Sequence, residues 1–151
     1  MSIEVIDESG TDVDVERLSR LSRFVMDLLR VHPQAELSVL LVDEEAMSAL
    51  HEQHMGEEGP TDVLSFPMDE LRPGLLDEEP EEGVLGDIML CPQIAEQQGV
   101  TAGHGTLAEI ELLTTHGILH LLGYDHAEPE EEREMFALQR RLLLEHLAER
   151  R

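Results

Sequence analysis

The sequence of 151 residues contains no tryptophan, no lysine, one tyrosine and one cysteine. With Cys91 alone, the chain cannot form an internal disulfide or a cysteine-based zinc site, and we expect Cys91 to be a small apolar residue at the end of a strand. No apolar run approaches the ~18 residues that a membrane-spanning helix needs, so we expect no membrane association. The first residues include Glu4 and Asp7 and lack the basic and apolar regions of a secretory signal, which makes a cytoplasmic location the expectation.

Positive charge is also scarce, because 10 arginines face 34 acidic residues and the formal net charge is −24. Nucleic acid backbones are bound mainly through Lys and Arg, so this balance opposes nonspecific binding to nucleic acid. Any role on RNA needs a local positive site, the charge of a metal ion or a partner protein. Many of the carboxylates fall in a predicted solvated acidic loop, residues 69–83, and at the start of the last predicted helix, where they favour the helix dipole.

The length suits one domain, residues 1–151, and neither an internal repeat nor a second domain is apparent. Apolar spacing and capping residues predict four strands and five helices. The strands are expected at residues 3–6, 37–42, 63–66 and 84–90, and the helices at 13–30, 43–54, 92–98, 106–122 and 129–149. This order predicts an α+β fold in which a small mixed β-sheet packs against several helices.

The most informative segment contains three histidines, His116, His120 and His126, within eleven residues. Histidines four residues apart lie on one face of a helix about one turn from each other, so the first two imidazoles can reach a single ion. Gly123 is a typical helix stop, and a reversal there would bring His126 to the same ion. Three protein ligands and one open position are typical of catalytic zinc sites, whereas structural zinc sites usually have four. The spacing therefore predicts a catalytic metal site.

The same spacing matches the metzincin protease pattern His-Glu-x-x-His-x-x-Gly-x-x-His, except that Gly117 stands in the place of the glutamate. In those proteases the glutamate is the general base, so its absence argues against ordinary peptide hydrolysis. Asp125 and Asp87 are candidates for contacts to the metal-bound histidines or for proton transfer. Two plainer roles stay open, because Asp125 can cap the following turn and Asp87 can hold a neighbouring loop.

Three segments together resemble the YbeY family of ribosomal RNA maturation factors. They are the histidine run, residues 60–67 with the sequence Pro-Thr-Asp-Val-Leu-Ser-Phe-Pro, and the Gly-Asp-Ile stretch at 86–88. The resemblance implies a zincin-like fold with its metal site at the end of a central helix, and one zinc ion held by His116, His120 and His126. It also implies a single-strand-specific, metal-dependent endoribonuclease that acts in 3′-end maturation of small-subunit ribosomal RNA and in ribosome quality control. Ribosomal RNA and the small ribosomal subunit are the implied partners.

The chain departs from the family at a position a few residues before the Pro-Thr segment. Many members carry an arginine there, where this chain has Met55, and Arg72 is a candidate replacement charge for holding RNA.

Either a water on the metal or the 2′ hydroxyl of the RNA could attack the phosphodiester. Two other functions stay open: a zincin-like hydrolase of another substrate, most plausibly a peptidase, and a ribosome-assembly binding factor with a structural zinc whose acidic face contacts basic ribosomal proteins.

Overall fold

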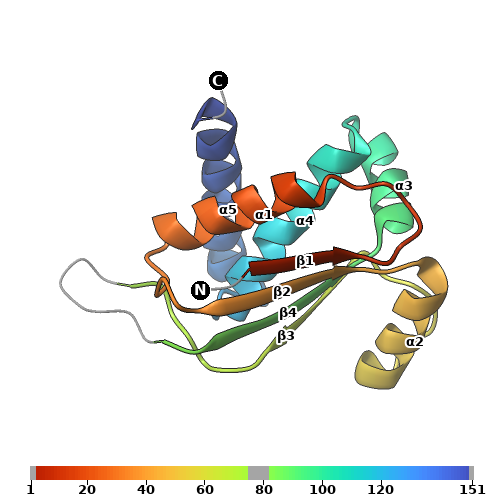
Figure 1. Cartoon of the computed structure of the whole chain (residues 1–151), viewed down its shortest axis with the longest axis horizontal. Helices are drawn as coiled ribbons and strands as arrows, with labels where there is room; N and C mark the ends of the chain where they lie inside the picture. The colour runs from red at the N-terminus through yellow and green to blue at the C-terminus, as the bar shows by residue number, and fades with distance from the viewer. Residues whose placement is uncertain (1–2, 75–81, 150–151) are drawn as a thin grey trace.

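Strands and helices alternate along the computed structural model, which describes residues 3–74 and 82–149 (Figure 1). All the predicted elements form, with ends that differ by a few residues. The strands are β1 (Ile3–Asp7), β2 (Glu36–Leu41), β3 (Val63–Pro67) and β4 (Val84–Leu90), and the helices are α1 (Val15–Leu28), α2 (Glu44–Met55), α3 (Pro92–Ala102), α4 (Thr106–Leu121) and α5 (Pro129–Glu149). Residues 69–74 and 82–83 of the predicted acidic loop contain no helix or strand, and residues 75–81 lie outside the described residues.

Helix α3 is four residues longer than predicted because Gly99 lies inside it rather than ending it. A Cβ atom at Gly99 would come within 2.9 Å of the carbonyl oxygen of His104, so the absent side chain lets α3 lie against the turn that leads into α4. The helix instead ends at Gly103, which adopts a left-handed conformation with φ of 84°.

The four strands form a mixed sheet in the order β1-β2-β4-β3, in which β1, β2 and β4 are parallel and β3 is antiparallel to β4. The register between β2 and β4 shifts after the pair Glu36 and Val84, so that Leu37 pairs with Gly86. Gly86 has φ of 147°, and a Cβ atom there would collide with the carbonyl oxygen of Phe66 on β3. Glycine at this position therefore permits the close approach of β3 and β4.

Figure 1 shows α1, α4 and α5 on one side of the sheet and α2 on the other. Because successive strand residues point to opposite faces, Val39 and Ile88 belong to the larger core, which α1 and α4 share. Leu40 and Met89 pack against a smaller core that includes Met47 of α2. Cys91 is buried in this smaller core, as expected for an apolar role. None of the helices formed by residues 3–74 and 82–149 is long and apolar enough to span a membrane.

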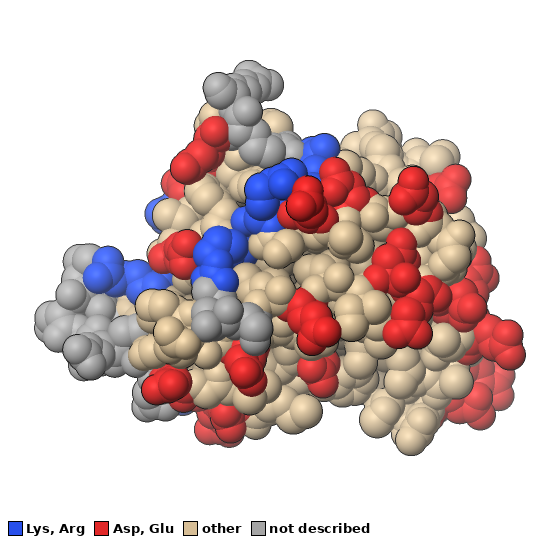
Figure 2. All heavy atoms as spheres, viewed as in Figure 1, with Lys and Arg blue, Asp and Glu red and all other residues tan. Residues whose placement is uncertain are grey.

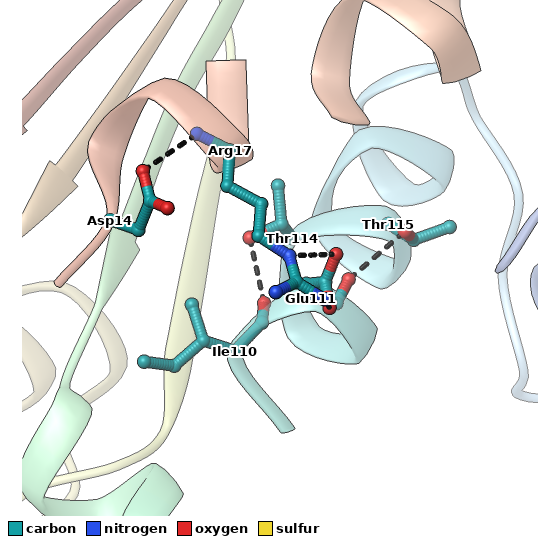
Figure 3. Close-up of polar contacts among 6 residues, drawn as sticks. All are labelled: Asp14, Arg17, Ile110, Glu111, Thr114 and Thr115. Atoms are coloured by element: carbon teal, nitrogen blue, oxygen red, sulfur yellow. Dashed lines mark hydrogen bonds and ion pairs between the residues drawn. The ribbon is translucent and has the colours of Figure 1, made fainter. Parts of the chain in front are cut away.

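Helix α4 is the central helix and contacts α1, α3, α5, β3 and β4. Its buried hydroxyl groups are satisfied within the helix, because Thr114 donates to the carbonyl oxygen of Ile110 at 2.7 Å and Thr115 donates to that of Glu111 at 3.0 Å. Figure 3 shows these bonds beside an ion pair that joins α4 to α1. In that pair, Nη2 of Arg17 lies 3.1 Å from Oε1 of Glu111, whose side chain is 9% exposed. Two parallel contacts hold the two side chains, since Nε of Arg17 also donates to Oε2 at 3.4 Å.

We expect Arg17→Ala to lower the free energy of unfolding by about 2–3 kcal/mol, because it leaves the Glu111 carboxylate in a mostly buried position without its arginine. The matched control, Arg20→Ala, removes an exposed pair with Glu16 and should cost less than about 0.5 kcal/mol. Urea denaturation measures both changes. An Arg17→Ala variant as stable as Arg20→Ala would contradict this role of the ion pair.

Candidate metal centre

The C-terminal end of α4 carries the first two histidines of the run and then reverses the chain. The N–H of Gly123 donates to the carbonyl oxygen of His120, and the N–H of Tyr124 donates to that of Leu119, both at 3.0 Å. These two bonds form a Schellman motif, which requires a residue in the left-handed conformation, and Gly123 has φ of 96°. The predicted helix stop at Gly123 is therefore confirmed, and the chain that follows it carries His126 back toward α4.

His116, His120 and His126 each offer one ring nitrogen, and these nitrogens all lie within 4.8 Å of one another. The ring centroid of His116 lies 4.6 Å from that of His120 and 5.6 Å from that of His126. Burial lowers the pKa of His116 and of His120, and the neighbouring imidazoles lower both further. Metal ions bind the neutral form of imidazole, so the environment favours the form that a metal requires. The three histidines are thus positioned to bind one metal ion.

Helix α5 supplies two residues to this centre that the sequence analysis missed, Gln139 and Phe136. Nδ1 of His116 lies 2.9 Å from Oε1 of Gln139. Because an amide oxygen can only accept, this contact favours the tautomer with the proton on Nδ1, which leaves Nε2 for an ion. The ring of Phe136 is nearly parallel to those of His116 and His126, with centroids 6.0 and 6.1 Å away. Gln139 is buried between apolar residues of α5. A polar residue on this otherwise apolar helix face was the feature of the sequence that could have indicated a role for Gln139.

The two carboxylates predicted for this site, Asp125 and Asp87, lie differently relative to the three histidines. Oδ1 of Asp125 accepts a hydrogen bond from the N–H of His126 at 2.7 Å, which supports the backbone that carries the third histidine. Asp87 lies on β4 next to Ile88, whose side chain faces Gly117 of α4. Because neighbouring strand residues point to opposite faces, Asp87 points away from the face on which α4 lies. The structure therefore brings Asp125, but not Asp87, next to the histidines.

A cleft of about 400 Å³ opens over the histidines, and we call it the histidine cleft. Its wall is β3 with Met55 at the end of α2. The residues that line it are Met55, Val63, Leu64, Ser65, Phe66, Pro67, His116, His120 and His126. Arg72 lies outside it, in an adjoining hollow of about 470 Å³ that shares His120 and Pro67 with the cleft.

Gly117 lies where α4 comes closest to the sheet beneath the cleft. A Cβ atom at Gly117 would lie 3.0 Å from Cδ1 of Ile88 and 3.2 Å from Oγ of Ser65. Even a methyl group here would require the side chains of Ile88 and Ser65 to shift by a few tenths of an ångström, so the packing disfavours a glutamate at this position. The metzincin base is therefore absent from the sequence, and its position is tightly packed in the fold.

A model of one protein family, described as Endoribonuclease YbeY, matches residues 4–147 of the chain. The chain belongs to the YbeY endoribonuclease family. A protein named Endoribonuclease YbeY from Nocardioides sp. is 71% identical over 143 residues, which are 95% of this chain and 96% of that one. Another protein of the same name, from Thermobifida fusca, is 65% identical over 143 residues, which are 95% of this chain and 92% of that one. The resemblance drawn from the histidine run is thus confirmed, and membership of the YbeY family supports an endoribonuclease role.

A solved structure agrees with this assignment. The solution structure of TM1509 from Thermotoga maritima has a TM-score of 0.66 and 29% sequence identity, covering 98% of this chain and 91% of that chain. The predicted α+β fold with a small mixed sheet is confirmed by the strand order and by this structural neighbour.

We expect Gln139→Ala to weaken zinc binding by about 10–100-fold, because partners that orient ligating histidines typically contribute that much to metal affinity. Gln139→Glu should bind zinc at least as tightly as the parent protein, since a carboxylate is a stronger acceptor for the Nδ1–H of His116. Competition with a chromogenic chelator measures both affinities. Gln53→Ala, at an exposed position of α2, is the control. Equal affinities for Gln139→Ala and Gln53→Ala would contradict the orienting role.

Proposed function

We propose that this YbeY protein is a zinc-dependent endoribonuclease that cuts single-stranded RNA. In this proposal it acts in the cytoplasm, in 3′-end maturation of small-subunit ribosomal RNA and in ribosome quality control. The observation that carries the proposal is the convergence of three ring nitrogens, from His116, His120 and His126, beside an open cleft. Three imidazoles without a carboxylate form a donor set that suits zinc. A bound zinc ion would supply positive charge beside the phosphoryl oxygens of the substrate and a free coordination position.

The histidine cleft suits an unpaired strand better than a duplex. Met55, Phe66 and Pro67 give its wall an apolar character. Bases of a single strand can contact apolar and aromatic side chains, whereas bases in an A-form duplex are stacked inside the helix. Ser65 lines the same wall, where its hydroxyl group can bond a sugar or phosphate oxygen. These residues would orient the RNA, while Gln139 and Phe136 hold the histidines in place.

The acidic surface favours a role in a ribosomal complex over free diffusion on RNA. The net charge of −24 repels phosphate at a distance, so attraction has to come from the metal centre or from basic partners. Figure 2 shows acidic side chains scattered over the viewed face and gathered at its right. We propose that these carboxylates contact basic proteins of the small ribosomal subunit and bring the histidine cleft to its RNA.

A peptidase is less well supported by the same site. None of the described residues that line the histidine cleft is Asp or Glu, so no carboxylate there is placed to act as the general base of a zinc peptidase. On α4, the position of the metzincin base is Gly117, and its tight packing against Ile88 and Ser65 disfavours a carboxylate side chain there.

We expect the metal-loaded protein to cut a single-stranded RNA oligonucleotide, and His120→Ala to cut it at least about 100-fold more slowly, because one of three metal ligands is lost. The same oligonucleotide in a duplex, and a peptide substrate, should remain intact. Gel electrophoresis of end-labelled RNA measures the cleavage. His32→Ala, outside the metal centre, is the control and should cut normally. Equal cleavage by His120→Ala and His32→Ala would exclude a nuclease that depends on these histidines.

A further inference from the structure

A second hollow adjoins the histidine cleft, and we call it the Arg72 hollow. It measures about 470 Å³, and its lining includes Glu70, Arg72, His120 and Tyr124. We infer that the Arg72 hollow binds the nucleotide next to the cleaved phosphodiester, with the Arg72 guanidinium on that nucleotide's phosphate and the ring of Tyr124 against its base. This inference rests on the proposed endoribonuclease function and adds to it a location for the neighbouring nucleotide.

The two spaces adjoin at the metal centre. Pro67 and His120 line both the histidine cleft and the Arg72 hollow. An RNA strand whose phosphodiester lies at the histidines has to continue on both sides of them. The Arg72 hollow lies on one of these sides and could receive the next nucleotide. Its volume of about 470 Å³ falls within the roughly 300–1,000 Å³ of small-ligand sites, so its size is compatible with one nucleotide.

Arg72 is placed differently from the other described arginines. The others lie on α1, on α5 or, for Arg30, shortly after α1, and Figure 2 shows basic side chains in a row across the face where Figure 1 places α1. Several of them pair with carboxylates, as Arg17 does with Glu111 and Arg141 with Glu145. Arg72 forms no ion pair with any residue in the described ranges, and it lines a hollow that reaches a histidine of the metal centre. Its charge is therefore available to a phosphate.

The backbone on both sides of Arg72 is anchored. On one side, the N–H of Asp69 donates to the carbonyl oxygen of Val84 at 3.0 Å, and Oδ2 of Asp69 accepts from the N–H of Val84 at 2.8 Å. On the other side, the side chain of Leu71 is buried, and the N–H of Gly74 donates to the carbonyl oxygen of Leu29 at 3.0 Å. A held backbone reduces the entropy that Arg72 loses on binding a ligand.

The other polar groups of the hollow make opposite contributions. The carboxylate of Asp69 is already engaged by Val84, but Glu70 is exposed in the lining and would repel a phosphate. Tyr124 is half-buried, and its ring packs against the core while it lines the hollow. Stacking on an aromatic ring stabilises a bound base without requiring positive charge. The inference therefore predicts opposite effects for substitutions at Arg72 and Glu70.

The test measures kcat, KM and the dissociation constant of a single-stranded RNA oligonucleotide for the metal-loaded protein at several salt concentrations. Arg72→Ala should raise KM by about tenfold with little change in kcat. It should also reduce the slope of log affinity against log salt concentration by about one, as expected for the loss of one phosphate contact. Arg72→Lys should recover part of the loss, whereas Glu70→Gln should lower KM. Arg20→Ala removes the same charge from an exposed position of α1 and should leave both constants unchanged. Thermal unfolding verifies that each variant is folded.

The outcomes separate this inference from the proposed function. If His120→Ala is inactive but Arg72→Ala behaves like Arg20→Ala, or if Glu70→Gln raises KM, the hollow is not a nucleotide site although the nuclease assignment stands. If the protein binds RNA without cutting it and Arg72→Ala weakens binding, the cleavage proposal fails and the nucleotide site stands. If the protein neither binds nor cuts RNA, both are overturned.

Discussion

The close approach of α4 to β3 and β4 at Gly117 is the constraint on which the rest of this site depends. With no side chain at Gly117, the helix lies against Ile88 and Ser65, and the histidines on either side of it, His116 and His120, reach the cleft beside β3. The same contact disfavours the glutamate that a zinc peptidase would carry there. Packing and chemistry are thus coupled, because the residue that brings the helix close enough also removes the general base.

Local features of the site could be predicted from the sequence. Four-residue spacing places His116 and His120 on one helix face, and Gly123 supplies the left-handed conformation that ends the helix, so both follow from backbone geometry alone. The contributions of Gln139 and Phe136 could not be predicted in this way, because they depend on how α5 packs beside α4. The position of Asp87 relative to the histidines could not be predicted either, because it depends on which face of the sheet α4 covers.

The electrostatics of the protein differ between its surface and its metal centre. The surface carries most of the net charge of −24, whereas the histidine cleft is lined by apolar and neutral groups. Burial lowers the pKa of His116 and of His120, which favours the neutral form of these two histidines before an ion is bound. Because these ligands are neutral, they would leave the full charge of the ion available to an anionic substrate. An acidic protein can in this way attract one phosphodiester without binding nucleic acid over its whole surface.

The central claim is that one ion, held by three histidines, enables this YbeY protein to cut RNA. Titration of the metal-free protein with zinc tests it most directly, with heat of binding and RNA cleavage followed on the same samples. Both signals should saturate at about one zinc per chain, as expected for a single three-histidine site. Undiminished cleavage by the metal-free protein in the presence of a chelator, or saturation of zinc binding without any cleavage, would contradict it.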